Sequence, residues 1–101
     1  MPSNISLSLA PIRGLTDAPF RNLFAKHFPG FDFSIAPFVN PMQNPSPKAF
    51  KDVFPEANTG FPIIPQFLNN NADDILATAR IFADLGYTEA NWNLGCPAPM
   101  V

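Results

Sequence analysis

The chain has 101 residues, of which 47% are hydrophobic and 14% charged, and its formal net charge is −2. This composition is typical of a globular domain and excludes a basic nucleic-acid-binding patch, because the six cations are scattered: Arg13, Arg21, Lys26, Lys48, Lys51 and Arg80. One cysteine excludes an intrachain disulfide, no apolar run is long enough for a bilayer, and the first residues lack the charge of a secretory signal, so we expect a cytoplasmic protein with no membrane partner.

The first forty residues predict a strand, a helix and a second strand. Residues 5–10 form the first strand, which Pro11 ends. Thr16 or Asp17 caps the helix, and Pro19 is tolerated in its first turn. Residues 31–39 form the second strand. The helix is expected to bury a stripe of Phe20, Leu23, Phe24 and Phe28 and to carry Lys26 and His27 in its last turn.

The remaining residues repeat this alternation. Ser46 and Pro47 begin a short helix that runs to residue 54, and residues 62–68 form a third, apolar strand. Asn71 caps the next helix and Gly86 ends it. Residues 87–93 form a fourth strand. The stripe predicted for the second long helix is Ile75, Leu76, Ala79, Phe82 and Ala83.

Alternating strands and helices favour an α/β fold with parallel strands and right-handed crossovers. A doubly wound sheet and the first half of an eight-fold barrel both fit this order. Gly14 is a lone glycine after the first strand, so the G-x-G-x-x-G pattern of dinucleotide binding is missing. The sequence also holds no cluster with the spacing of metal ligands, and we expect no metal.

Three strand ends carry a signature. They are LAPIRGLTDAPFR at residues 9–21, PQF at residues 65–67 and NLGCP at residues 93–97. Together and in this order they resemble the tRNA-dihydrouridine synthases, flavin enzymes built on a TIM barrel. The first segment is similar to the opening motif of that family, the second to its flavin-contacting glutamine, and the third to the motif with its catalytic cysteine.

The resemblance implies that residues 1–101 are the amino-terminal portion, about four strands, of an FMN-binding TIM (β/α)8 barrel. The later strands and the helical carboxyl-terminal domain that binds tRNA would then be absent. We therefore expect the 101-residue chain by itself to bind FMN weakly or not at all and to be inactive.

The resemblance also implies the reaction and the role of each site residue. A uridine in tRNA is reduced across C5–C6 to dihydrouridine, with a hydride from reduced FMN to C6, and NADPH reduces the flavin again. By this resemblance, the backbone at Pro11, Ile12 and Arg13 would lie along the flavin ring, and Gln66 would hydrogen-bond the polar edge of that ring. Asn93 would position the uracil, and Cys96 would protonate C5.

Physical chemistry supports these roles independently. A flavin needs a flat apolar shelf and a few fixed amides, because its pyrimidine edge presents both donors and acceptors. Gln66 and Asn93 each offer both. An ordinary thiol, with a pKa of about 8.5, is mostly protonated at neutral pH and can serve as a general acid.

Each residue also has a plainer interpretation. A free cysteine such as Cys96 is most often a small buried hydrophobe, and Asp17 is expected to be a helix cap rather than an acid. His27 is expected at the surface, and so are Arg13 and Arg21. The phenylalanines at positions 20, 24, 28 and 82 are expected in the core.

Several positions depart from the family pattern. Ile12 replaces a methionine, Asn91 stands where an aspartate is common, the second strand lacks a glutamate, and residues 98–100 lack a basic residue. Two alternatives to tRNA reduction remain open. One is another FMN-dependent barrel reductase that acts on a free pyrimidine or an enone, and the other is a non-catalytic α/β interaction module.

Overall fold

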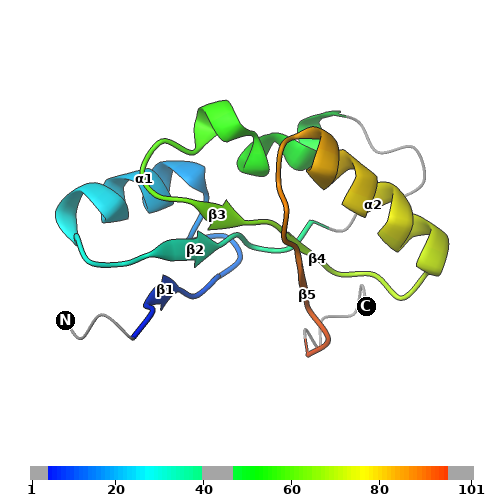
Figure 1. Cartoon of the computed structure of the whole chain (residues 1–101), viewed down its shortest axis with the longest axis horizontal. Helices are drawn as coiled ribbons and strands as arrows, with labels where there is room; N and C mark the ends of the chain where they lie inside the picture. Colours follow the sequence, from blue (N-terminus) through cyan, green and yellow to red (C-terminus); the bar gives the residue numbers. More distant parts are fainter. Residues whose placement is uncertain (1–4, 40–46, 96–101) are drawn as a thin grey trace.

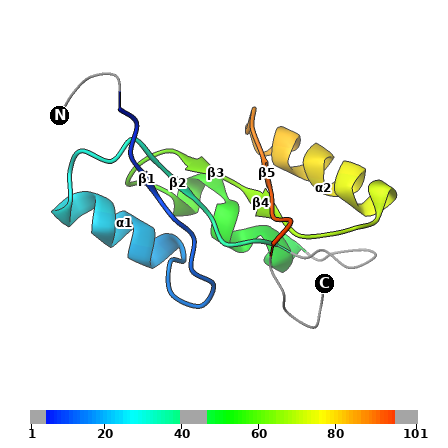
Figure 2. The same cartoon turned by 90° about the horizontal axis from the view of Figure 1, so that it is seen from below.

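The computed structural model describes residues 5–39 and 47–95. In this part of the chain, short strands alternate with helices (Figure 1). The elements are β1 (Ser8–Leu9), α1 (Ala18–His27), β2 (Phe33–Ile35), the 3-10 helices η1 (Pro47–Val53) and η2 (Pro55–Ala57), β3 (Ile63–Ile64), β4 (Gln66–Phe67), α2 (Ala72–Asp84) and β5 (Asn91–Trp92). The helices lie above the strands in Figure 1, and the strands lie in front of the 3-10 helices when seen from below in Figure 2.

All the strand pairs are parallel, which confirms the predicted α/β class. One sheet has the order β1-β2-β3 and the other pairs β4 with β5. The two sheets are joined at Val39, whose N–H donates to the Gln66 carbonyl at 2.9 Å and whose carbonyl accepts from the Leu68 N–H at 3.1 Å. Within residues 5–39 and 47–95, the strand pairings therefore run from β1 through β2 to β3, and from β4 to β5, in the order of the sequence.

The predicted third strand, residues 62–68, is divided at Pro65 into β3 and β4. The Pro65 carbonyl accepts from the Asn91 N–H at 2.9 Å, so this residue faces β5. Any other residue at this position would also donate its backbone N–H toward β5, but proline has no N–H. The pairing with β5 therefore begins at Gln66. The other predicted strands are also shorter in the structure than the sequence pattern suggested.

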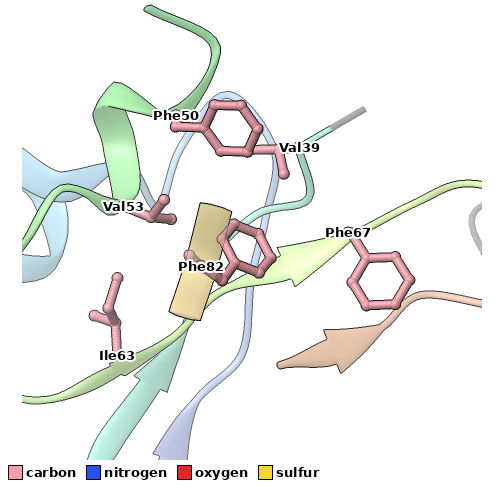
Figure 3. Packing of buried hydrophobic residues seen from close by; sticks show 7 residues of the cluster. Val39, Phe50, Val53, Ile63, Phe67 and Phe82 are labelled. Atoms are coloured by element: carbon pink, nitrogen blue, oxygen red, sulfur yellow. The ribbon is translucent and has the colours of Figure 1, made fainter. Parts of the chain in front are cut away.

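The core lies between the strands on one side and α2 with η1 on the other (Figure 3). Phe82 of α2 packs edge-to-face on Phe50 of η1, with ring centroids 6.0 Å apart. Burial of such aromatic side chains is the main stabilising contribution, at about 25 cal/mol per Å² of apolar area. The buried cluster consists of Ala36, Val39, Phe50, Val53, Ile63, Phe67 and Phe82.

The predicted apolar stripes are only partly correct. Phe82 is buried as expected, but Leu23 on α1, Phe28 directly after α1 and Leu76 on α2 are exposed. Thr78 takes a buried place on α2 instead, and its hydroxyl donates to the Asp74 carbonyl at 2.8 Å. A polar side chain can be buried at this position because the helix itself satisfies its hydrogen bond.

The predicted helix ends are confirmed within the described residues. Asp17 caps α1 by accepting from the Phe20 N–H at 3.1 Å, and Asn71 caps α2 in the same way. Gly86 follows α2 with a φ of 101°, a conformation that favours glycine. His27 is exposed at the end of α1, as expected. The predicted cap Ser46 lies outside the described residues.

The expectation that Arg21 lies at the surface is wrong. Its side chain is only 1% exposed and forms an ion pair with Asp52 at 2.8 Å. The guanidinium also donates to the Thr16 carbonyl at 2.7 Å and to the Asn58 side-chain oxygen at 2.7 Å. Burial of a charge is tolerated only with such partners, so Arg21 ties α1 to the segment that contains η1 and η2.

A tight contact at Gly60 gives a first prediction. A Cβ atom at this position would lie 2.7 Å from the Ala25 Cβ and 3.2 Å from the Asn22 Cα on α1. We expect Gly60→Ala to lower the free energy of unfolding by about 1–3 kcal/mol, because close-packed groups must move apart. Urea denaturation measures the change. Gly95→Ala is the matched control, since no atom of the described residues lies within 4 Å of a Cβ there, and equal stability of the two variants would contradict the prediction.

Tyr87 gives a second prediction, on pH dependence. Its hydroxyl donates to the Val53 carbonyl at 2.5 Å, and burial raises the pKa of its phenol above the ordinary value of 10.0, against the opposing effect of Arg21. The folded state therefore holds this proton more tightly than the unfolded state. Its contribution to stability is complete below pH 10.0 and is lost as the pH rises through the higher folded pKa.

We expect Tyr87→Phe to weaken this alkaline loss of stability. Unfolding measured from neutral pH to above pH 10 in both proteins tests this, and the difference in tyrosinate absorbance between them assigns the titration to Tyr87. A Tyr87 phenol that ionises at or below its ordinary pKa would contradict the prediction.

Candidate functional site

The candidate site lies at the carboxyl ends of the strands. Parallel strands end at one common edge, which is where barrel enzymes place their chemistry. The three segments of the signature reach this edge after β1, at β4 and after β5. Within the described residues, the turn at Ile12, Gln66 and Asn93 therefore each lie at the end of a strand.

The turn after β1 is fixed by Thr16. The buried Thr16 hydroxyl accepts from the Ile12 N–H at 2.8 Å and donates to the Ile12 carbonyl at 3.2 Å. The Leu15 N–H donates to the same carbonyl at 3.0 Å. Pro11 has no N–H, so this turn presents the side chain of Ile12, which is 55% exposed, rather than a backbone donor from Pro11 or Ile12.

Arg13 follows in the same turn and is exposed. Its guanidinium lies over the Phe38 ring, 4.7 Å from the ring centroid. Both residues line a cavity of about 380 Å³, together with Asp17 and Asp52. These two carboxylates are already used to cap α1 and to pair with Arg21, so the cavity offers no carboxylate that is reserved for a ligand.

Gln66 is the centre of a chain of side-chain amides. Its side chain is only 6% exposed, and its Nε2 donates to the Asn91 Oδ1 at 2.7 Å. Its Oε1 accepts from the Asn93 Nδ2 at 3.3 Å. We call Gln66, Asn91 and Asn93 the amide relay. The structure thus brings Gln66 and Asn93, predicted as flavin and uracil ligands, into direct contact.

Strand alternation explains why these three amides meet. Gln66 is paired with Asn91 in the parallel register, and Asn93 lies two residues further on the same face. Phe67 and Trp92 occupy the opposite face, where their rings stack with centroids 6.0 Å apart. Phe67 belongs to the buried core. The aromatic pair therefore fixes the register of the two strands and holds the amides on the face away from α2.

The relay continues into the loop after β5. The Gly95 N–H donates to the Asn93 Oδ1 at 3.0 Å. Cys96, the predicted acid, is the next residue, and it lies outside the described residues together with positions 98–100. Its role stays a prediction.

Asn91 is the site residue that the sequence interpretation missed, because it was treated only as a departure from the family pattern. The signal was present in the spacing. Asn91 and Asn93 are two residues apart in the predicted fourth strand, residues 87–93, and so share a face.

Residues 5–39 and 47–95 contain no group of three or more histidine, cysteine or acidic side chains that could hold a metal ion. None of the helices in these two ranges has both the length and the apolar character that a membrane crossing requires. The polar chemistry of the site is therefore carried, within these ranges, by amides and one exposed arginine.

Comparison with known proteins identifies relatives of the whole signature. The sequence model of the dihydrouridine synthase (Dus) family matches residues 8–101. The chain is 32% identical over 93 residues to a probable tRNA-dihydrouridine synthase of Rhodobacter capsulatus, covering 92% of this chain and 29% of that protein. It is 33% identical over 100 residues to the tRNA-dihydrouridine(16) synthase of Neisseria meningitidis serogroup A, covering 92% of this chain and 30% of that protein.

The tRNA-dihydrouridine synthase B of Pasteurella multocida is 29% identical over 93 residues, covering 92% of this chain and 28% of that protein. The chain thus spans less than a third of the length of these relatives. No solved structure matches it. The family match covers β1 to β5 and all three strand-end segments. The chain therefore belongs to the dihydrouridine synthase family.

Proposed function

We propose that the protein to which this chain belongs reduces a uridine in tRNA to 5,6-dihydrouridine, with FMN as its cofactor and NADPH as the reductant. One observation carries this proposal beyond the family match. The Asn93 amide donates to Gln66 at 3.3 Å, and Asn93 lies three residues before Cys96 in the sequence. This contact supports the proposal, because it joins the residue proposed to bind the cofactor to the residue proposed to bind the substrate.

The described residues fit a flavin ring. The exposed Ile12 side chain supplies apolar surface on a turn that Thr16 holds rigid. The relay uses one N–H and one acceptor position of the Gln66 amide, and a carboxamide has a second of each for a pyrimidine edge. Pro11, Ile12 and Arg13 would border the ring, and Gln66 would bind its polar edge. Bound FMN would supply the hydride for C6 of the uracil.

The other steps would involve Asn93 and Cys96, which follow β5 in the sequence. Asn93 would orient the uracil by hydrogen bonds to its polar groups. Cys96 would hold a proton on Sγ and transfer it to C5, which completes the reduction of the C5–C6 double bond. A thiol suits this step because its ordinary pKa of about 8.5 keeps it protonated at neutral pH.

We further propose that residues 1–101 form the first strands of a TIM (β/α)8 barrel. The parallel strands in chain order, with helices between them, support this. Most contacts with tRNA would lie outside this chain, because burial of Arg21 removes one of its six cationic side chains from the surface. We expect the 101-residue chain alone to be inactive and to bind FMN poorly, and we expect the enzyme to act in the cytoplasm.

The scarcity of surface cations also favours a second candidate, an FMN-dependent reductase of a free pyrimidine. Electrostatic attraction to phosphates dominates most tRNA and DNA binding, and this chain supplies little of it. Reduction of free uridine at a rate equal to that of unmodified tRNA would favour this candidate over tRNA reduction.

The first experiment is a visible spectrum of the purified protein produced from the gene continued past Val101. Flavin absorption near 450 nm, a property of oxidised FMN, followed by dihydrouridine formation in unmodified tRNA with NADPH, is the expected result. A protein that stays colourless after incubation with FMN would overturn the proposal and leave a non-catalytic α/β module.

A further inference from the structure

We infer that Asn91 is a positioning residue, and that the Gly95 N–H sets the orientation of the Gln66 amide through the amide relay. The inference rests on the proposed function, because it assigns a role to residues behind the flavin ligand. It concerns two residues for which the family resemblance gave no role.

The direction of the relay follows from one fixed donor. A side-chain amide can turn over and exchange its oxygen and nitrogen, so its orientation is decided by its partners. A backbone N–H can only donate. The Gly95 N–H lies 3.0 Å from the Asn93 side chain and so requires Oδ1 at that position. The Asn93 Nδ2 is then turned toward Gln66.

The same logic passes along the chain of amides. The Asn93 Nδ2 requires an acceptor, which places the Gln66 Oε1 toward it at 3.3 Å. The Gln66 Nε2 consequently faces Asn91, whose Oδ1 accepts at 2.7 Å. Asn91 therefore acts here as an acceptor, and it closes the relay at the end opposite Gly95.

Low exposure makes this orientation matter. Gln66 is only 6% exposed, so the partners of its amide are the relay and whatever binds at the strand edge. Without an acceptor at position 91, a buried N–H would lose its partner, at a cost comparable to a lost hydrogen bond. The amide would then turn over or move, and the pattern of donor and acceptor offered to a pyrimidine edge would change.

The relay also connects the cofactor ligand to the loop of the proposed acid. Gly95 directly precedes Cys96.

The test uses the flavoprotein produced from the gene continued past Val101, stripped of flavin and titrated with FMN. We expect Asn91→Leu to weaken FMN binding about tenfold and to shift the flavin midpoint potential, whereas Asn91→Asp keeps the acceptor and stays within about threefold of the wild-type Kd. Tight binding and an unchanged potential in Asn91→Leu would overturn the inference. So would an Asn91→Asp protein as weak as Asn91→Leu, because side-chain shape alone would then explain the effect.

A second pair of variants tests the other end of the relay and covers the case in which Asn91→Leu does not fold. Gly95→Pro removes the N–H, and Gly95→Ala keeps it in a place with room for a Cβ. We expect an altered flavin spectrum and weaker FMN binding only in Gly95→Pro. Wild-type binding and spectrum in Gly95→Pro would overturn the inference. A wild-type protein that never binds FMN would instead refute the proposed function.

Discussion

Replacing Cys96 with alanine in the protein continued past Val101 is expected to slow uridine reduction by about 10²–10⁴-fold, the usual contribution of a positioned acid or base. The substitution removes the only proton donor that the resemblance places at C5. Because the amide relay and the turn at Ile12 stay intact, FMN should remain bound. The measurement is dihydrouridine formed in unmodified tRNA in single turnovers, with the flavin spectrum recorded on the same sample.

Leu94→Ala is the matched control, since the Leu94 side chain is exposed two residues before Cys96 and contributes nothing to the relay. It tests whether any change in this loop slows the reaction. A Cys96→Ala protein that reduces tRNA at the wild-type rate would remove Cys96 from the mechanism and return it to the role of a small apolar residue. Loss of the flavin in the same variant would assign it to cofactor binding instead.

The features predicted well from the sequence are those that depend on local patterns. Alternation of strands and helices gave parallel strands, and Asp17 and Asn71 were recognised as caps because a cap is a property of a few adjacent residues. The amides at positions 66 and 93 were each expected at the end of a strand, and the structure places them in contact.

The features predicted wrongly depend on partners far apart in the sequence. Arg21 looks like a surface residue in its own helix, but it is buried against partners that include Asp52 and Asn58, 31 and 37 residues away. Apolar periodicity similarly placed Phe28 in the core. That residue is exposed in the described structure, and its ring stacks on Phe24, with centroids 4.8 Å apart. Periodicity identifies a face of a helix but not what packs against it.

The division of the predicted third strand into β3 and β4 could be predicted from the sequence, because Pro65 stands in the middle of the apolar run. Proline in a strand that is paired on both sides interrupts one of its ladders. The apolar character of residues 62–68 favoured one continuous strand, which this effect of proline prevents. The chemistry of the edge is unaffected, since Gln66 follows the interruption and keeps its pairing with Asn91.

The ion pair of Arg21 and Asp52 supports the second large prediction. Asp52→Ala is expected to lower the free energy of unfolding by about 3–5 kcal/mol, because it leaves a guanidinium that is only 1% exposed without its counter-charge. It also removes the acceptor for the Ala18 N–H, at 2.7 Å, in the first turn of α1. Lys51→Ala is the matched control, since Lys51 is the exposed neighbour on η1. Urea denaturation of the purified proteins measures the difference.

Arg21→Met tests the pair from the other side. Asp52 is 32% exposed, so water can solvate its carboxylate after the arginine is lost, and we expect a smaller cost than for Asp52→Ala. The double variant Arg21→Met with Asp52→Ala should be clearly more stable than the sum of the two single changes predicts, because no buried charge is left unpaired. Strict additivity would show that the two side chains contribute independently.

The same network reaches the proposed flavin turn. Arg21 donates to the Thr16 carbonyl at 2.7 Å, and the Thr16 hydroxyl holds both the N–H and the carbonyl of Ile12. A variant that breaks the ion pair and still folds should therefore also loosen this turn. We expect such a protein to bind FMN more weakly than Lys51→Ala does. Unchanged FMN affinity in a destabilised Arg21→Met protein would confine the role of the ion pair to the fold.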